Sequence, residues 1–186
     1  MNTILQQELK KILNGRFSQS ESTRLNYSRG EDTYDPILSK AVVFPETNEE
    51  VSKILKLCNE HKVPVVPFGT GTSLEGNVVG NDKGITISLE KMNKILTVNT
   101  QDFDCRVQAC VTREQLNDYL REDGVFFPID PGANAAIGGM ASTSASGTMA
   151  VKYGTMKTVI TGLTVVLPNG EIMNTGGRTK KNFCWI

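Results

Sequence analysis

A glycine-rich stretch, Pro67 to Gly76, has the composition of an anion-binding loop and follows the strand-like run Val63 to Val66. Its glycines permit backbone conformations closed to other residues and let the main chain approach a ligand closely. Successive backbone N–H groups in such a turn can form a concave nest for phosphate oxygens. Hydroxyl donors are added by Thr70, Thr72 and Ser73. Because the stretch contains no Lys or Arg, we expect dipoles rather than a cationic side chain to bind the anion.

The spacing within this stretch separates several kinds of phosphate loop. A nucleoside triphosphatase loop ends in Gly-Lys-Ser/Thr, whereas Leu74, Glu75 and Gly76 stand here. A nicotinamide dinucleotide fingerprint needs a third glycine, where this chain has Leu74, and a helix directly after it. Glu90 stands about 20 residues further on, where that fingerprint places its ribose-binding acid. A nicotinamide-binding protein and a tight loop without a ligand therefore stay open as alternatives.

A second unusual stretch, Ala135 to Gly147, consists almost entirely of small residues. Low-complexity filler is one interpretation. We favour another, in which the backbone approaches a large flat ligand and bulky side chains would fill the space that the ligand needs. Gly138 and Gly139 would then stand at a helix N-terminus that faces phosphate. Pro128 to Gly132 precedes this stretch and Tyr153-Gly154 follows it.

The overall composition excludes some function classes. The chain has 186 residues, enough for one domain with a core, and its 20 basic and 20 acidic residues cancel. Without a basic patch, nucleic acid is a poor candidate partner. No apolar run is long enough to span a bilayer, and the N-terminus has no signal-peptide core. We expect a cytoplasmic protein, and docking on a membrane surface stays open.

The cysteines and the single histidine do not indicate a metal site. Cys58, Cys105, Cys110 and Cys184 form no C-x-x-C pair. A spacing of five within one strand would place Cys105 and Cys110 on opposite faces, so we expect buried free thiols and no metal. His61 is predicted to end a helix, where the helix dipole favours it, rather than to act in catalysis.

Both helices and strands are predicted around these stretches, from apolar residues that recur every three to four positions or every second position. The helix of residues 3–14 carries an apolar face made of Ile4, Leu5, Leu9, Ile12 and Leu13. Two further helices begin with capping boxes, one at Thr47 with Glu50 and one at Thr112 with Gln115. Residues 18–36 are polar and turn-rich and are predicted to run over the surface. The expected strands are residues 41–44, 63–67, 84–89, 95–98 and 105–109, and a hairpin of 163–167 and 171–173 around Asn169-Gly170. The mixture indicates an α+β fold.

Four stretches taken in order resemble one known family. These stretches are residues 67–76, 128–132, 137–147 and 153–156. They are similar to the FAD-binding domain of the vanillyl-alcohol-oxidase type, also called the PCMH type, and within it to the group that contains D-lactate dehydrogenases and glycolate oxidase. The resemblance covers residues 41–177. It implies two α/β subdomains with mixed and antiparallel sheets, preceded by an N-terminal helix and surface segment in residues 1–40. The FAD-binding domain of residues 41–186 would lack its last strands, and the cap domain would be absent.

The resemblance also implies which residues bind the cofactor. The loop would hold the FAD pyrophosphate, Pro131 and Gly132 would lie near the flavin, the small-residue stretch would line the cofactor channel, and Tyr153 and Gly154 would close it. FAD is expected to be non-covalent, because the loop contains neither His nor Cys. The implied set is Pro67, Gly69, Thr70, Gly71, Thr72, Ser73, Leu74, Gly76, Pro131, Gly132, Ile137, Gly138, Gly139, Ser142, Thr143, Ser146, Gly147, Tyr153 and Gly154.

The implied activity is oxidation of a small D-2-hydroxy acid by hydride transfer to flavin N5, with D-lactate as the first candidate and glycolate as the second. Electrons would pass to an acceptor such as a cytochrome or a quinone. The family's substrate arginine, metal-ligand histidines and catalytic base belong to the cap domain, so no catalytic residue is assigned here and this chain alone is expected to be inactive. The alternatives are a non-catalytic flavin-binding module and a 2-hydroxyglutarate-type dehydrogenase.

Overall fold

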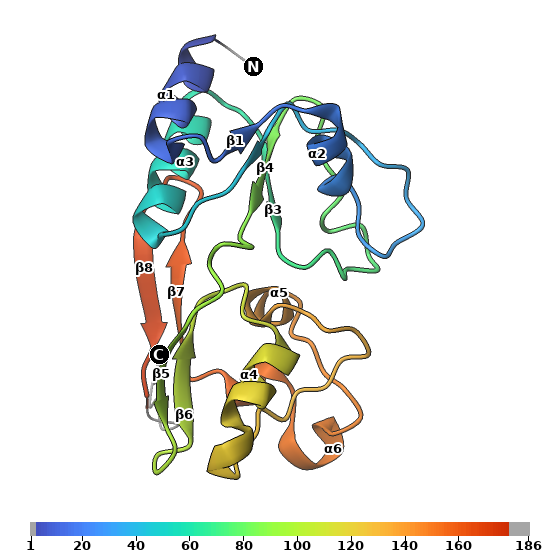
Figure 1. Ribbon diagram of the computed structural model, residues 1–186, viewed down its shortest axis with the longest axis vertical. Coiled ribbons are helices and arrows are strands. Elements are labelled where there is room, and N and C mark those ends of the chain that lie inside the picture. The colour runs from blue at the N-terminus through green and yellow to red at the C-terminus, as the bar shows by residue number, and fades with distance from the viewer. Residues whose placement is uncertain (1–2, 179–186) are drawn as a thin grey trace, which may run out of the picture. The chain divides into compact units, whose positions relative to one another are not determined.

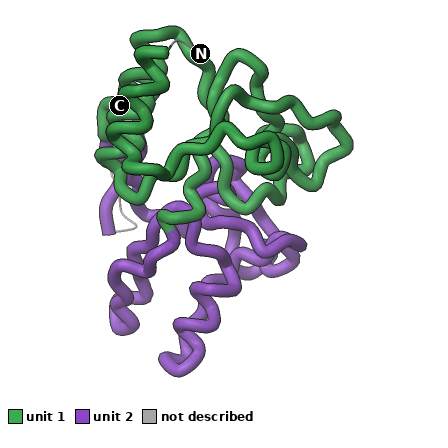
Figure 2. Tube along the Cα trace, turned by 45° about the horizontal axis from the view of Figure 1, so that its top comes forward, with its two compact units in different colours: residues 1–92, 166–172 green, residues 93–165, 173–186 purple. Residues whose placement is uncertain are grey.

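The computed structural model describes residues 3–178, which form an α+β fold divided into two compact units (Figure 2). Unit 1 contains the described residues up to Met92 together with Val166–Ile172. Unit 2 contains Asn93–Val165 and the described residues from Met173 onward. Cys184, for which a free thiol was expected, lies outside the described residues.

Unit 1 is built on a four-stranded sheet with the strand order β1-β2-β4-β3 (Figure 1). Strands β2 and β3 both run parallel to the central strand β4, and β1 runs antiparallel to β2. Every residue of β4 is buried, including Thr86 and Ser88. The Thr86 hydroxyl donates to Ser39 Oγ at 2.8 Å, so the buried polar group has a partner. The elements of unit 1 are α1 (Thr3–Leu13), β1 (Phe17–Ser18), α2 (Glu21–Asn26), β2 (Val42–Val43), α3 (Asn48–Glu60), β3 (Val65–Phe68) and β4 (Ile85–Ser88).

Helices α1 and α3 lie side by side and supply much of the core of unit 1 (Figure 1). The predicted apolar face of α1 is confirmed for Leu5, Leu9 and Leu13, which are fully buried. The prediction is wrong for Ile4, which is 58% exposed. A stripe with spacing of four faces the core, and Ile4 lies about 100° away from Leu5 around the helix.

The segment of residues 18–36 contains regular structure that the sequence did not predict. Ser18 ends β1, and Ser20 caps α2 by accepting from the backbone N–H of Thr23 at 3.2 Å. Each residue of α2 is at least partly exposed. Because α2 buries no apolar stripe, the periodicity that indicates a helix is missing from its sequence.

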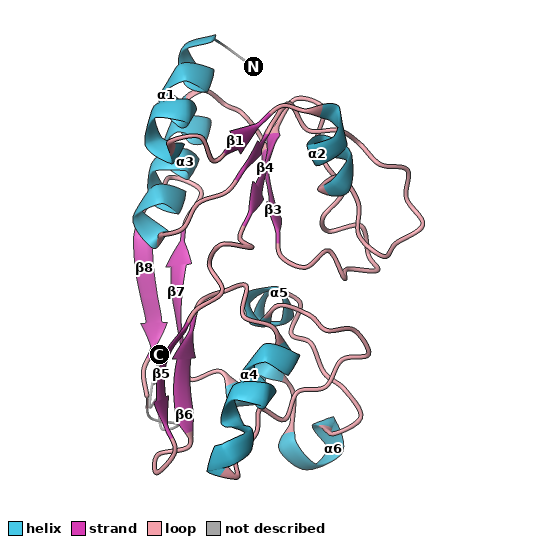
Figure 3. Cartoon of the chain, in the orientation of Figure 1, coloured by secondary structure: helices cyan, strands magenta, loops and turns pink. Residues whose placement is uncertain are grey.

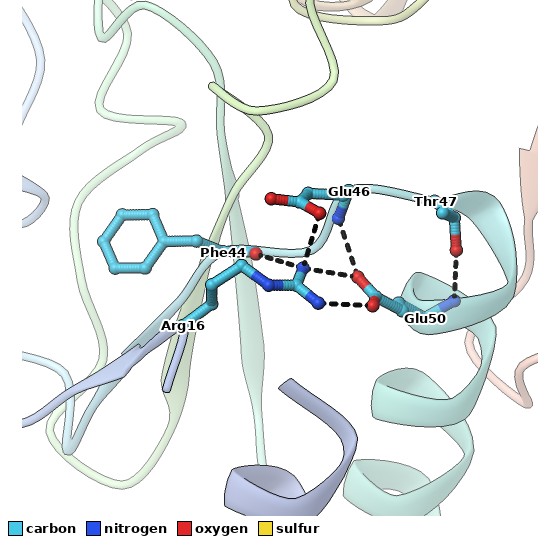
Figure 4. Close-up of polar contacts among 5 residues, drawn as sticks. All are labelled: Arg16, Phe44, Glu46, Thr47 and Glu50. Carbon is cyan, nitrogen blue, oxygen red and sulfur yellow. Dashed lines mark hydrogen bonds and ion pairs between the residues drawn. The ribbon is translucent and has the colours of Figure 1, made fainter. Parts of the chain in front are cut away.

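The start of α3 is joined to Arg16, directly before β1, by a cluster of polar groups (Figure 4). As predicted, Thr47 caps α3, with its hydroxyl oxygen accepting from the N–H of Glu50 at 3.1 Å. The Glu50 carboxylate accepts from the Glu46 N–H at 2.8 Å and from both terminal nitrogens of Arg16, at 2.5 and 2.6 Å. Arg16 also donates to the Phe44 carbonyl oxygen at 3.0 Å. Hydrogen bonding to Arg16 lowers the pKa of Glu50 below its ordinary value.

Unit 2 contains an antiparallel pair of strands and short helices (Figure 3). Helix α4 begins at the predicted cap, where Thr112 Oγ1 accepts from the N–H of Gln115 at 3.2 Å. Its apolar residues Leu116 and Leu120 are buried with Val111. A second cluster forms around Ile129, Met140 and Met156. The elements are β5 (Ile95–Asn99), β6 (Asp104–Val107), α4 (Arg113–Leu120), the 3-10 turn η1 (Arg121–Asp123), α5 (Ile137–Ser142), α6 (Ala150–Tyr153) and α7 (Met156–Val159).

The predicted hairpin is confirmed as β7 (Gly162–Val166) and β8 (Ile172–Gly176). Its turn closes through the Leu167 N–H, which donates to the Glu171 carbonyl oxygen at 2.8 Å. Gly170 has φ of 85°, a conformation that favours glycine.

The expectation of buried thiols holds for Cys58 and Cys110 and is wrong for Cys105, which is exposed. The two residues Cys105 and Cys110 do not share a strand, because β6 ends at Val107. Burial raises the pKa of Cys58 to about 12. His61 is the C-cap of α3, in the predicted position. Within residues 3–178 no helix combines the length and apolar character that a membrane crossing requires.

Candidate functional site

The glycine-rich stretch forms an extended loop that leaves β3 without becoming a helix (Figure 3). Pro67 lies within β3, and the other predicted residues of this stretch follow it. Gly71 and Gly76 have φ of 75° and 69°. A Cβ added to Gly71 would lie 2.8 Å from the ring of Phe68. These glycines are therefore required by the loop's own conformation, which agrees with the expected use of glycine.

The loop carries backbone donors that the described protein does not use. Among residues 3–178, the N–H groups of Gly71, Thr72 and Ser73 donate to no other residue. The hydroxyls of Thr70 and Thr72 approach each other at 3.4 Å, and Ser73 Oγ accepts from the side chain of Asn77 at 3.2 Å. Backbone amides that point to one side of a loop can bind an anion, so the loop offers donors of the kind that a phosphate group needs.

Glu90 has a different role from the one that a nicotinamide fingerprint would give it. Its carboxylate accepts a hydrogen bond from the hydroxyl of Tyr27. The ring of Tyr27 packs edge-on against Phe44 and Phe68, with centroids at 5.4 and 5.1 Å. Glu90, which is exposed, is thus hydrogen-bonded to a tyrosine that packs against Phe68, directly before the loop.

In unit 2, the small-residue stretch forms α5, whose glycines differ in what surrounds them. A Cβ on Gly138 would lie 2.8 Å from the Cβ of Ala109, and the Gly138 N–H donates to the Ala109 carbonyl oxygen at 2.8 Å. The Gly138 amide predicted to face phosphate is therefore engaged within the protein. A Cβ on Gly139 or Gly132 would meet nothing within 4 Å. These two positions leave open space that a ligand could occupy.

Two of the predicted hydroxyl groups in this stretch are also engaged within the protein. Ser142 donates to the Gly138 carbonyl oxygen at 2.9 Å and Thr143 to that of Gly139 at 3.2 Å, so both close turns of their own helix. Ser146 is exposed.

Asp130 lies within the predicted stretch of residues 128–132 but was not among the predicted site residues, and its side chain holds two segments together. Its carboxylate accepts from the Thr148 hydroxyl at 2.6 Å and from the Met149 N–H at 3.0 Å. These hydrogen bonds, with that of Thr148 the stronger influence, lower the pKa of Asp130. A Cβ on Gly147 would lie 2.2 Å from the Asp130 carbonyl oxygen. The segment around Asp130 is therefore held in contact with residues 147–149. The sequence signal for this contact was a polar residue, Asp130, between the apolar residues Ile129 and Pro131.

Tyr153 and Gly154 lie at the end of α6. The Tyr153 ring packs edge-on against Phe126, with centroids at 5.5 Å. Gly154 has φ of 82°, and a Cβ there would lie 2.2 Å from Thr158 Oγ1. Gly154 is accordingly fixed by local packing.

The predicted residues form two groups, one in each unit. The loop group in unit 1 comprises Pro67, Gly69, Thr70, Gly71, Thr72, Ser73, Leu74 and Gly76. The group in unit 2 comprises Pro131, Gly132, Ile137, Gly138, Gly139, Ser142, Thr143, Ser146, Gly147, Tyr153 and Gly154.

Comparison with known proteins identifies the family of this chain. A family model described as an FAD binding domain matches residues 39–176. A probable mitochondrial D-lactate dehydrogenase of Danio rerio is 44% identical over 164 residues, which are 88% of this chain and 33% of the relative. The glycolate oxidase protein GlcD of Bacillus subtilis is 34% identical over 168 residues, or 89% of this chain and 36% of the relative. The chain thus spans about a third of the length of these relatives.

Solved structures share the fold. An alkyldihydroxyacetonephosphate synthase matches 100% of this chain and 36% of its own, with a TM-score of 0.86 and 21% identity. A p-cresol methylhydroxylase matches 93% of this chain and 35% of its own, with a TM-score of 0.76 and 24% identity. At such identity the likeness concerns the fold alone.

Proposed function

This chain belongs to the FAD binding domain family of the vanillyl-alcohol-oxidase type, and we propose that it forms the cofactor-binding part of an oxidoreductase acting on a small D-2-hydroxy acid. The observation that carries the proposal is that the backbone N–H groups of Gly71, Thr72 and Ser73 have no acceptor among residues 3–178. The match of residues 39–176 to an FAD binding domain supports FAD over a nicotinamide dinucleotide as the ligand of this loop.

We assign the pyrophosphate of FAD to the loop group. The amides there would bind its oxygens as dipoles, and the loop contains no Lys or Arg that would neutralise them. Donors that are already in position before binding need little free energy for reorganisation. Such a loop can therefore bind an anion without a cationic side chain. Gly69, Thr70 and Leu74 would complete the pyrophosphate-binding loop, with Pro67 and Gly76 at its two ends.

The group in unit 2 is assigned to the rest of the cofactor, with Gly132 and Gly139 at the positions of closest approach. Gly138, Gly147 and Gly154 would act indirectly, by keeping the neighbouring backbone in place. FAD is proposed to bind non-covalently, because the loop offers no His or Cys for a tether. When bound, FAD supplies the two-electron acceptor that oxidation of a hydroxy acid needs.

The cofactor assignment is tested by the visible absorption spectrum of the purified chain before and after acid precipitation. We expect a flavin spectrum that passes into the supernatant. Gly139→Leu should abolish flavin retention by filling open space, whereas Gly177→Leu, the matched control at another open glycine, should retain it. A colourless wild-type protein with native circular dichroism would contradict the assignment.

For the substrate, D-lactate is the first candidate, because several relatives are named D-lactate dehydrogenases, and glycolate is the second. The complete gene product should bleach its flavin with D-lactate in the absence of oxygen. No bleaching with any D-2-hydroxy acid would favour a non-catalytic flavin-binding module, and bleaching with 2-hydroxyglutarate alone would favour that substrate.

The electron acceptor is proposed to be a cytochrome or a quinone, as the name of the relative from Arabidopsis thaliana includes a cytochrome. Reduction of cytochrome c by the complete gene product would test this. A cytoplasmic location with docking at a membrane surface stays a prediction that cell fractionation would check.

A further inference from the structure

Gly30, which belongs to none of the motifs above, lies directly against the glycine-rich loop within unit 1. A Cβ built on Gly30 would lie 2.5 Å from the Ser73 carbonyl oxygen and 3.0 Å from the Gly71 carbonyl oxygen. Oxygen atoms are the nearest loop atoms in both cases. The carbonyl groups of Gly71 and Ser73 therefore point toward Gly30.

The direction of these carbonyls fixes the direction of two amides. In a trans peptide the C=O and the N–H of one unit point in opposite directions, and no described peptide bond is cis. The N–H groups of Thr72 and Leu74 share their peptides with the carbonyls of Gly71 and Ser73. Both N–H groups consequently point away from Gly30, toward the same side of the loop.

We propose that residues 27–34 are a positioning segment that turns the amides of Thr72 and Leu74 outward to receive the FAD pyrophosphate. The inference rests on the proposed function and extends it to residues that do not touch the cofactor. Glycine-rich loops lose much conformational entropy when they become ordered. A segment that orders the loop in advance removes part of that loss from the free energy of binding.

The positioning segment is itself held in shape by Asp32. Its two carboxylate oxygens accept from the N–H groups of Gly30 and Tyr34, each at 3.1 Å. The Tyr34 ring then lies against Gly76, where a Cβ would come within 2.8 Å of two ring carbons. Asp32 therefore fixes the positions of Gly30 and Tyr34, the two residues of the segment that contact the loop.

Tyr27 supports the loop from a second direction. Its ring packs against Phe68, and the ring of Phe68 lies under Gly71. The hydroxyl of Tyr27 donates to Glu90, two residues beyond the end of β4. The loop is thus supported at Gly71, Ser73 and Gly76 by one continuous segment.

The test measures FAD affinity by quenching of flavin fluorescence, together with the thermal midpoint of each protein without FAD. Gly30→Ala should weaken FAD binding by about tenfold, the loss expected when one amide no longer reaches a charged oxygen. Gly177→Ala, where a Cβ meets nothing within 4 Å, is the control and should bind FAD as the unchanged protein does.

A second pair of variants avoids the steric clash. Asp32→Ala removes the acceptors that shape the segment and should also weaken binding, whereas Asp32→Asn keeps one acceptor and should restore most of the affinity. If Gly30→Ala does not fold, this pair decides. Unchanged FAD affinity in Asp32→Ala, or in a folded Gly30→Ala, would overturn the inference alone. Absence of FAD binding by the unchanged protein would overturn the proposed function and the inference with it.

Discussion

The ion pair between Arg16 and Glu50 provides a quantitative prediction about stability (Figure 4). Both side chains are about one-fifth exposed, at 20% and 19%, and the guanidinium meets the carboxylate through two hydrogen bonds. Exposed pairs contribute about 0–1 kcal/mol, and breaking a fully buried pair costs about 3–5 kcal/mol. For this partly exposed pair, which lies between those two limits, we expect Glu50→Gln to lower the free energy of unfolding by about 2 kcal/mol at pH 7.

The pH dependence separates charge from hydrogen bonding. Because the pKa of Glu50 is lowered in the folded protein, its contribution is present above the pKa of an unfolded glutamate, about 4.3. That contribution is lost as the pH falls through the lower pKa of the folded state. The difference between wild type and Glu50→Gln should therefore shrink steadily below about pH 4.3. Urea denaturation followed by circular dichroism at several pH values measures it.

Glu46 supplies the control for this experiment. It lies 3.8 Å from the Arg16 guanidinium and its side chain is 51% exposed, so Glu46→Gln should cost less than about 0.5 kcal/mol at any pH. Equal stabilities of the two variants at pH 7 would refute the reasoning. A deficit of Glu50→Gln that persists undiminished in acid would refute the electrostatic part of it.

Three further predictions concern unit 2 and the thiols. Asp130→Ala, which removes both acceptors described above, should lower the thermal midpoint measured by circular dichroism, and an unchanged midpoint would argue against its role in holding the two segments together. Gly138→Ala should destabilise the protein by about 1–3 kcal/mol because its Cβ would overlap Ala109, as urea denaturation would show; wild-type stability would mean that the helix can shift freely. Cys105 should react with iodoacetamide in the native protein while Cys58 reacts only after unfolding, as mapping of alkylated peptides would show; modification of both at equal rates would contradict the assigned burial.

The sequence predicted the elements whose signals lie within a few neighbouring residues. It did not predict features that depend on contacts between distant residues. The caps at Thr47 and Thr112 depend on residues three positions apart, and both were found. Helix α2 was missed because it buries no stripe. The α+β class followed from alternating periodicities.

The same division holds for the candidate site. Glycine at positions 71 and 76 indicated positive φ from residue type alone, which the structure confirms. The support of the loop by Gly30 and Tyr27 was invisible, because roughly forty residues separate the partners along the chain. Asp32 accepts from the N–H of Tyr34 two residues further on, which is an Asx turn, and an Asp in a polar segment was the one local signal that could have directed attention to it.

Glycines that look alike in a motif can be required for opposite reasons, and this decides which variants test a ligand. Gly138 and Gly139 are neighbours in α5, yet a Cβ on the first would overlap Ala109 and a Cβ on the second would enter open space. A side chain at Gly138 would perturb the protein with or without FAD. Of these two neighbours, Gly139 is the one where a larger side chain can compete with a ligand while leaving the apoprotein intact, so loss of FAD there, at unchanged stability, is evidence about the cofactor itself.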